Sequence, residues 1–217
     1  MPGAGCRIRD MTKPEIVTAE QWQRERGELL LAEKEATRSL DALAARRRRL
    51  PMTPFGNGYK FDAPRGPVTL LDLFDGRDQL AVYQHMDVGP DAFCPGCTAF
   101  TDNVTNLELL AKAGVSWATV SNMPLSQIEE RKAQRGWTMP FVSSRGTTFA
   151  DDCGAGGGFA LCAFLRDGDD IYLTYSTTAR GVDRLVFANN VLDLMAWGRQ
   201  QEWEDSPAGW PQHPTYG

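Results

Sequence analysis

Two cysteines separated by two residues, Cys94 and Cys97 in the segment F-C-P-G-C, are the residues of this sequence best suited to chemistry. A Cys-x-x-Cys pair at the junction between a strand and a helix is typical of a dithiol–disulfide redox site. The free N–H groups and the dipole of a helix N-terminus favour negative charge, so they stabilise a thiolate, the form of cysteine that acts as a nucleophile. We expect Cys94, the first of the pair, to be the nucleophile and Cys97 to be the resolving cysteine.

Inert thiols and half of a zinc site are the alternatives for this pair. A structural zinc site needs about four ligands. The remaining candidates are Cys153, Cys162, His85 and His213, and none of them makes a second closely spaced pair. The sequence therefore favours redox chemistry, and we expect no metal site.

The other cysteines differ in their surroundings. Cys162 lies in the apolar run F-A-L-C-A-F-L and is predicted to be a small core residue. Cys153 follows Asp151 and Asp152, whose carboxylates would raise the pKa of its thiol. Cys153 is nevertheless a candidate third redox cysteine, which would take the disulfide from Cys94–Cys97.

The composition excludes several classes of function. The chain has 217 residues and a net charge of −5, which argues against general binding of nucleic acid. No apolar run approaches the roughly 20 residues of a membrane helix, and the first residues lack the apolar core of a secretion signal. We therefore expect a cytoplasmic protein with no membrane or nucleic-acid partner. Met11 resembles a natural start, and no motif for a nucleotide, flavin or haem is present, so no cofactor is expected.

The elements around the cysteines alternate between strand and helix. The sequence predicts a buried strand over 79–87, a helix over 98–113, a strand over 115–120 and a helix over 124–135. Strands connected by helices in this way pair in parallel. After a glycine-rich loop over 143–158, two further runs separated by D-G-D-D predict a β-hairpin, and a last helix is expected over 181–197.

A long helix is predicted before this region, over residues 18–50. Thr18 can cap its first turn, and Pro51 ends it. Its length would be roughly 50 Å. It either packs along its own domain or reaches a second subunit and forms a homodimer. The basic run at 46–49 complements the helix dipole, and an anion site is the alternative. The predicted organisation is a disordered extension over 1–14, a helical arm over 15–54, the main domain over 55–200 and an extended tail over 201–217.

Several separate phrases of the sequence resemble one family. They are L-x-D-L-F-D-G-R at 70–77, C-P-x-C-x-x-x-x-D-N at 94–103, G-W-x-x-P at 136–140, F-L-R-D-G-D at 164–169 and T-Y-S-x-x-A-R-G-x-D at 174–183. The chain is therefore similar to the family called domain of unknown function 899, whose members are labelled predicted dithiol–disulfide oxidoreductases. The resemblance implies a thioredoxin-like α/β fold, with a central mixed sheet flanked by helices.

The resemblance also suggests residues beside the cysteines. Trp137 and Pro140 would shape a substrate groove, with Pro140 in a cis peptide that faces the cysteines. Arg180 would hold an anionic substrate or lower the pKa of a thiolate, or would simply pair with Asp183. The histidine that usually ends the strand before the cysteines is displaced by one position, to His85, so no family role is carried over to it.

Three functions remain open from the sequence. The leading one is a thiol–disulfide oxidoreductase acting on a disulfide or thiol of a protein or small molecule. A peroxiredoxin-like peroxidase is second, although the segment V-G-P-D-A-F before Cys94 lacks the threonine usual there. The third is a thioredoxin fold with a binding, scaffold or non-redox role.

Overall fold

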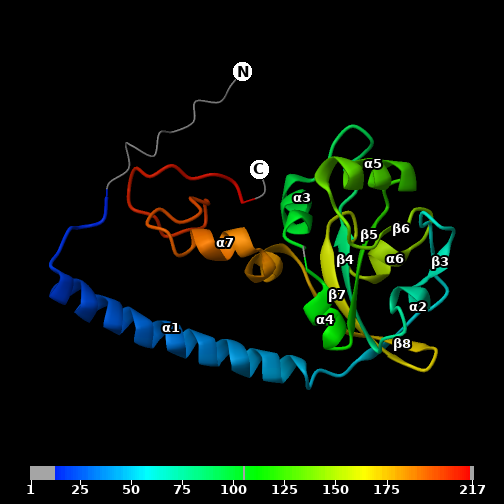
Figure 1. Cartoon of the computed structure of the whole chain (residues 1–217), viewed down its shortest axis with the longest axis horizontal. Helices are drawn as coiled ribbons and strands as arrows, with labels where there is room; N and C mark the ends of the chain where they lie inside the picture. The colour runs from blue at the N-terminus through cyan, green and yellow to red at the C-terminus, as the bar shows by residue number, and fades with distance from the viewer. Residues whose placement is uncertain (1–12, 105, 216–217) are drawn as a thin grey trace. The chain divides into compact units, whose positions relative to one another are not determined.

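A computed structural model of the chain describes residues 13–104 and 106–215 (Figure 1). Contacts divide them into two units, one made of residues 51–191 and the other of residues 13–50 with 192–215. The expected extension over 1–14 therefore lies almost wholly outside the described residues. Within the described ranges, no helix is both long enough and apolar enough to cross a membrane.

The unit of residues 51–191 is built on a six-stranded mixed sheet with the strand order β1-β8-β7-β4-β5-β6. Its strands are β1 (Thr53–Phe55), β4 (Gln79–His85), β5 (Val115–Ser121), β6 (Phe141–Ser143), β7 (Ala160–Asp167) and β8 (Asp170–Thr177). Strands β4, β5 and β6 are parallel, whereas β7 pairs antiparallel with both β4 and β8. The predicted parallel core and the predicted hairpin are thus confirmed, and the fold is a thioredoxin-like α/β fold.

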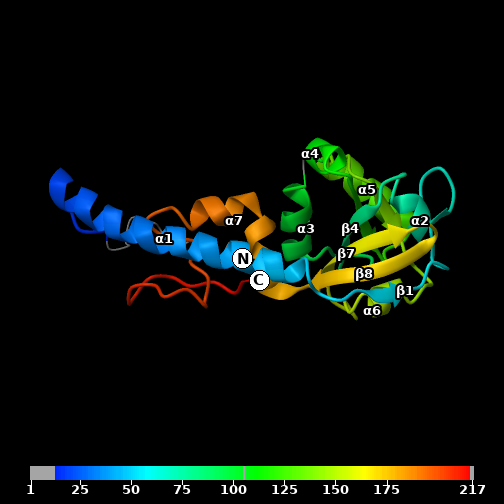
Figure 2. The same cartoon turned by 90° about the horizontal axis from the view of Figure 1, so that it is seen from below.

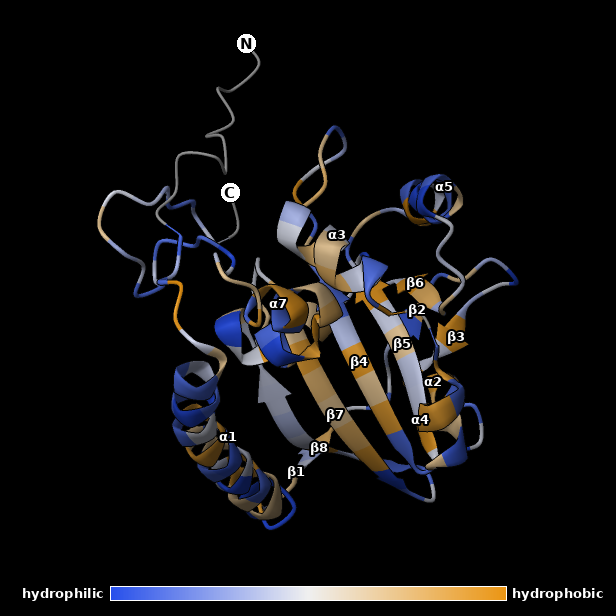
Figure 3. Ribbon diagram, turned by 60° about the vertical axis from the view of Figure 1, so that its left-hand side comes forward, coloured by the Kyte–Doolittle hydropathy of each residue, from blue (hydrophilic) through white to orange (hydrophobic). Residues whose placement is uncertain are grey.

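Strand alternation gives this sheet two different faces. One face carries Val82 and Cys162, which pack in the larger apolar core with α2 (Leu70–Leu73) and α6 (Phe149–Asp152). The other face carries Tyr83, which packs with Cys97 of α3 (Pro95–Asp102). The strands therefore separate two apolar layers, and Figure 3 shows orange hydrophobic segments along β4 and β7. Only the second layer contains the C-P-G-C segment.

The helices depart from the sequence prediction in three places. The expected helix over 98–113 is two helices, α3 and α4 (Glu108–Lys112), because the Asn103 side chain bonds back to the Ala99 carbonyl oxygen at 2.7 Å and closes the first helix. The last helix, expected over 181–197, is a 3₁₀ helix, η2 (Ala179–Leu185), followed by α7 (Phe187–Leu192). The glycine-rich loop contains the short helix α6. The helix α5 (Leu125–Arg135) follows its prediction closely and ends at Gly136, which has a φ of 70°.

A small second sheet completes this unit. Its two strands, β2 (Lys60–Phe61) and β3 (Val68–Thr69), pair antiparallel. Asp62 bridges to Ser143, so the small sheet is attached to the edge strand β6. This attachment covers the end of β6 that lies level with His85 of β4.

The other unit contains the long helix α1 (Ala19–Arg47), which Figure 2 shows as one continuous helix. Thr18 caps it as predicted, accepting a hydrogen bond from the Gln21 backbone N–H at 3.2 Å. No residue of α1 is buried, and Trp22 and Leu29 are more than half exposed. The segment 192–215 folds back on itself, with Gln201 and His213 forming an isolated β-bridge.

Candidate active site

The C-P-G-C segment lies where the chain passes from β4 into α3. Cys94 is the N-cap residue of α3, and Pro95 occupies the first helical position, where its missing N–H costs nothing. The Cys94 sulfur accepts a hydrogen bond from the Cys97 backbone N–H at 3.2 Å. A cysteine sulfur therefore takes the place that a serine or aspartate oxygen takes in an ordinary helix cap.

This position changes the acidity of Cys94. A hydrogen bond from the Cys97 thiol lowers the pKa of Cys94 to about 6, and the backbone N–H groups of Cys97 and Gly96 act in the same direction. Partial burial opposes them. At pH 7 a thiol with this pKa is about 90% thiolate.

Cys97 has the opposite character. It is only 1% exposed. Its contact with the Cys94 sulfur and its burial raise its pKa above the ordinary value, while a hydrogen bond from the Tyr83 side chain and one from the Met86 backbone act against the rise. The two cysteines therefore differ: the first is partly exposed with a lowered pKa, and the second is buried with a raised pKa.

Aromatic and aliphatic side chains enclose this pair. The Tyr83 ring stacks on Phe100 of α3 with centroids 4.1 Å apart, and Phe159 lies 6.2 Å from Tyr83 on another side. Val182 of η2 is buried in the same cluster. Sequence reasoning missed Tyr83, Phe159 and Val182. The alternation of β4 places Tyr83 on one face, but only the sheet order shows that Phe159, just before β7, lies next to the end of β4.

Trp137 reaches the site indirectly. Its indole N–H donates to the Asp102 carboxylate at 2.8 Å, and Asp102 also pairs with Arg135. Asp102 is the last residue of α3, so this network connects the helix that carries the cysteines to the end of α5. Trp137 packs in a cluster that includes Phe93, the residue before Cys94.

Arg180 lies in η2, the same segment as Val182. Its side chain is about half exposed, and its Nε lies 3.4 Å from an Asp183 carboxylate oxygen. Pairing of Arg180 with Asp183 was one of the alternatives predicted from the sequence. The lowered pKa of Cys94 comes from contacts within the C-P-G-C segment itself.

Pro140 is not brought together with the cysteines. The described residues contain no cis peptide bond, so the expectation of a cis Pro140 is wrong. Pro140 is exposed and precedes the edge strand β6, which β5 separates from β4. It lines a hollow of about 780 Å³ with residues of α2, β5 and α4. The strand that flanks β4 on its other side is β7, and the residue before β7 is Phe159 rather than a proline.

Cys153 and Cys162 lie on the opposite face of the sheet from Cys94. Both are buried in the larger core, and the Cys162 sulfur lies 3.6 Å from the Cys153 carbonyl oxygen. The predicted core position of Cys162 is confirmed. Cys153 contacts Cys162 and is separated from Cys94 by the sheet.

His85 is fully buried at the end of β4. Its Nδ1 lies 2.9 Å from the Met86 carbonyl oxygen, so this nitrogen carries the proton in the neutral ring. Burial lowers the pKa of His85 to about 4. Its Nε2 has no hydrogen-bond partner among the residues that the structure describes. The ring packs 5.7 Å from Phe141, so His85 is a neutral core residue at neutral pH.

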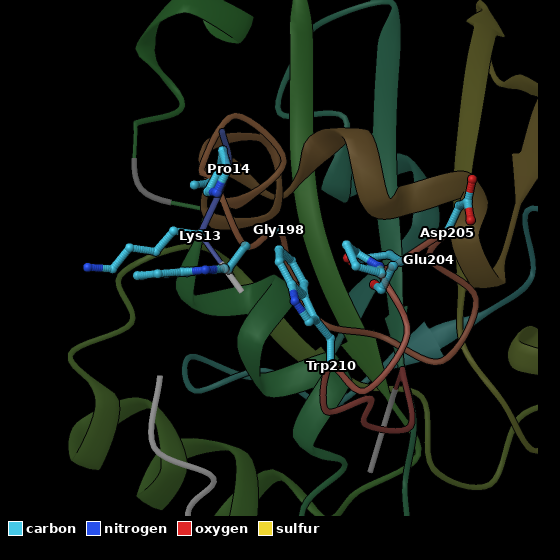
Figure 4. A pocket seen from close by; sticks show the side chains of 10 residues that line it. Lys13, Pro14, Gly198, Glu204, Asp205 and Trp210 are labelled. Carbon is cyan, nitrogen blue, oxygen red and sulfur yellow. The ribbon is translucent and has the colours of Figure 1, made fainter. Parts of the chain in front are cut away.

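The unit of α1 and the tail contains a separate hollow of about 480 Å³. Figure 4 shows Trp210, Glu204 and Lys13 around it. Its lining has no cysteine and no histidine. A third hollow of about 220 Å³ lies over Asp102 and Trp137. The cysteines line none of these three hollows.

The chain belongs to a family defined by a sequence model. Residues 11–216 match the model described as "Bacterial protein of unknown function (DUF899)". This match covers nearly the whole chain and confirms the resemblance seen in the sequence. No curated protein matches the chain.

Solved structures with a similar arrangement are distant in sequence. Peroxidoxin BcpB from Mycobacterium tuberculosis is 16% identical, with a TM-score of 0.48 over 63% of this chain and 94% of that one. A putative thiol-disulfide oxidoreductase from Bacteroides vulgatus is 17% identical, with a TM-score of 0.40 over 64% and 90%. Peroxiredoxin Q from Xanthomonas campestris is 20% identical, with a TM-score of 0.41 over 59% and 87%.

Proposed function

We propose that the protein is a thiol–disulfide oxidoreductase that uses Cys94 as nucleophile and Cys97 as resolving cysteine. The observation that carries this proposal is the asymmetry of the pair. Cys94 is partly exposed, with a pKa of about 6, whereas Cys97 is buried and protonated directly beneath it. Its substrate would be a disulfide or thiol of a protein or small molecule.

The reaction proceeds by two exchanges. The Cys94 thiolate attacks one sulfur of the substrate disulfide, so that a Cys94–substrate bond forms and the other substrate sulfur leaves as a thiolate. Cys97 then loses its proton and attacks the Cys94 sulfur. The Cys94–Cys97 disulfide forms, the second substrate thiolate leaves, and the substrate has been reduced by two electrons. The reverse sequence oxidises a dithiol.

The first exchange prepares the second. In the free dithiol, the largest cause of the raised pKa of Cys97 is its contact with the Cys94 sulfur. Once Cys94 is bound in a mixed disulfide, its negative charge is gone and this cause disappears. The contacts from Tyr83 and the Met86 backbone, which favour the Cys97 thiolate, then act without that opposition. Cys97 is thus activated only after Cys94 has reacted.

We also propose that Trp137 and Arg180 influence substrate binding. Trp137 supports the proposal because its cluster includes Phe93, next to the nucleophile. Arg180 supports it because its segment, η2, packs on the Cys97 side of the sheet and its guanidinium is about half exposed. Arg180→Lys keeps the charge, so comparing it with Arg180→Ala separates charge from geometry. Pro140 is left out of this proposal because it lines a different hollow.

An equilibrium titration tests the redox function. The reduced protein is incubated across a series of dithiol/disulfide ratios, alkylated, and mapped by mass spectrometry. A reversible two-electron step confined to Cys94 and Cys97 supports the proposal, and its midpoint gives the direction of electron flow. A pair that never forms a disulfide would overturn it.

Two variants separate the roles of the cysteines. Cys97→Ser should accumulate a mixed disulfide at Cys94, whereas Cys94→Ser should form none. A double serine variant that keeps the biological function would favour a binding or scaffold role. Rapid consumption of peroxide with a thiol donor, without reduction of disulfides, would favour a peroxidase.

We further propose that α1 pairs with α1 of a second copy. The helix buries none of its residues, and Trp22, Leu29, Ala36, Leu43 and Leu50 recur every seven residues from α1 to the turn that follows it. Residues 19–35 carry five glutamates against three basic residues, and residues 46–49 are four arginines. Antiparallel pairing would place each acidic half against the basic end of the other copy.

The oligomeric state tests this pairing. Light scattering with size-exclusion chromatography should give a dimer for the intact chain, and a monomer for a variant with Leu29→Glu and Leu43→Glu. The control with Arg24→Glu changes charge without touching the apolar stripe. A monomer for the unmodified chain at micromolar concentration would contradict the proposal.

A further inference from the structure

We propose that Cys153 and Cys162 are a second redox-active pair, a buried dithiol that a hydroperoxide converts into an intramolecular disulfide. The two residues are 2% and 1% exposed, and both belong to one apolar core. The Cys162 sulfur lies 3.6 Å from the Cys153 carbonyl oxygen, and the two thiols are in hydrogen-bonding contact. A disulfide requires two cysteines close together in the fold, and this contact meets that first requirement.

The pair is distinct from the C-P-G-C site. In the register of β4 and β7, Val82 lies opposite Cys162, and Tyr83 lies opposite Leu161. Tyr83 and Leu161 pack with Cys97 on one face, while Val82 and Cys162 face the other core. The sheet therefore stands between the two pairs, and each must be oxidised by its own route.

The surroundings of Cys153 provide an access route. Cys153 follows α6 directly, and its sequence neighbours Asp152 and Gly154 are both exposed. The chain beyond it contains Gly154, Gly156, Gly157 and Gly158. Gly154 and Gly156 have positive φ angles of 73° and 54°. Local opening of such a glycine-rich segment exposes a buried group without unfolding the domain.

The chemistry balances with a hydroperoxide as the only co-reactant. One of the two sulfurs attacks the peroxide oxygen, the O–O bond breaks, and a sulfenic acid and water (or an alcohol) are produced. The other thiol attacks the sulfenic sulfur, the S–S bond forms, and a second water leaves. Two thiols are oxidised by two electrons, and the hydroperoxide is reduced. Contact with Cys162 and burial raise the pKa of Cys153, whereas the hydrogen bond from Cys153 lowers the pKa of Cys162. Burial of both side chains keeps peroxide from the pair until the segment opens.

The disulfide would act on the neighbouring site. It would close a loop from Cys153 to Cys162 that contains Phe159, whose ring lies 6.2 Å from Tyr83 in the cluster around Cys97. Closing the loop restricts the positions open to Phe159. The oxidation state of this second pair would thereby adjust the packing beside Cys97.

A variant that retains only these two cysteines tests the proposal independently of the proposed function. The full chain with Cys6→Ser, Cys94→Ser and Cys97→Ser is treated with hydrogen peroxide under native conditions. It is then unfolded, alkylated and mapped by mass spectrometry. No Lys or Arg separates Cys153 from Cys162, so trypsin leaves both on one peptide. We expect this peptide to resist alkylation and to be two hydrogens lighter than its reduced form in most molecules. Alkylation of both thiols, or their separate conversion to sulfinic acids, would overturn the proposal.

Two controls make the result specific. Adding Cys162→Ser to the variant should abolish the cross-link and leave Cys153 as a sulfenic or sulfinic acid. The same peroxide treatment in denaturant should give a smaller share of cross-link relative to sulfinic acid among the oxidised molecules, because the fold no longer holds the thiols together. An equal share in denaturant would show that the native contact does not direct the pairing, and would also overturn the proposal.

Discussion

Replacement of Cys97 by alanine should raise the pH at which Cys94 becomes reactive. The Cys97 thiol is the largest cause that lowers the pKa of Cys94 from its ordinary value of 9.0 to about 6. At pH 7 a thiol with a pKa of 9 is only about 1% thiolate, compared with about 90% for a pKa of 6. The full shift therefore corresponds to a nearly hundredfold difference in the thiolate available at neutral pH.

The variant should lose part of this shift, not all of it. In Cys97→Ala the backbone N–H groups of residues 96 and 97 remain, so the pKa of Cys94 should settle between 6 and 9. Cys97→Ser keeps a hydroxyl donor and should lie between the wild type and the alanine variant. The limiting rate at high pH should be highest in the alanine variant and lowest in the wild type, because intrinsic thiolate nucleophilicity rises about threefold for each unit of pKa.

The assay is the rate of alkylation of Cys94 by iodoacetamide as a function of pH, followed on the peptide that contains Cys94. The wild-type rate should reach half its limit near pH 6. A wild-type midpoint near 9 would refute the claim that Cys94 is a stabilised thiolate. Identical midpoints in all three proteins would show that the backbone alone sets the pKa.

Three further predictions concern neighbouring residues. Tyr83→Phe removes the side-chain contact that favours the Cys97 thiolate. In a quenched-flow assay, a mixed disulfide at Cys94 should form at the wild-type rate and resolve more slowly. Equal resolution rates would count against a role of Tyr83 in activating Cys97. Asp102→Ala leaves the Trp137 indole N–H without its acceptor and should lower the free energy of unfolding by about 1–3 kcal/mol. Asp102→Asn keeps an acceptor and loses only a half-exposed ion pair worth about 0–1 kcal/mol. Urea denaturation measures both losses, and equal losses would contradict the argument. Burial lowers the pKa of His85 from 6.5 to about 4, so the neutral ring stabilises the fold fully above pH 6.5 and this contribution is lost as the pH falls toward 4. In His85→Gln, the free energy of unfolding measured with denaturant should depend less on pH between 6.5 and 4. An unchanged slope would exclude His85 as the cause of the pH dependence.

Local patterns were sufficient to predict the elements that bring Cys94 to its position. The apolar run before the cysteines predicted β4, and Gly136 with its charged helix predicted α5. These features depend on neighbours in the sequence, which is why spacing and turn residues reveal them. The identity of Cys94 as the acidic thiol follows from the same local geometry, because its hydrogen bonds come from residues 96 and 97.

The environment of Cys97 could not be predicted in this way, because it depends on which strands lie side by side. Pro140 was expected beside the cysteines since it enters an apolar strand after a helix, but that strand, β6, is at the edge of the sheet. The antiparallel return of β7 next to β4 gives that position to Phe159. Sheet order is a long-range property, and no spacing between residues 94 and 159 indicates it.

The register of β7 also decides which thiols can exchange. Successive side chains of a strand point to opposite faces, so a shift of one residue in the pairing of β7 with β4 would turn Cys162 toward Tyr83 and the C-P-G-C site. In the observed register Cys162 pairs with Val82 and contacts Cys153 on the other face. Transfer of a disulfide from Cys94–Cys97 to Cys162 within one molecule would require β7 to leave the sheet, because Cys162 lies on that strand. Oxidation of the first pair in the native protein should therefore leave the second pair reduced for as long as the sheet is intact, and the two pairs should respond to different oxidants.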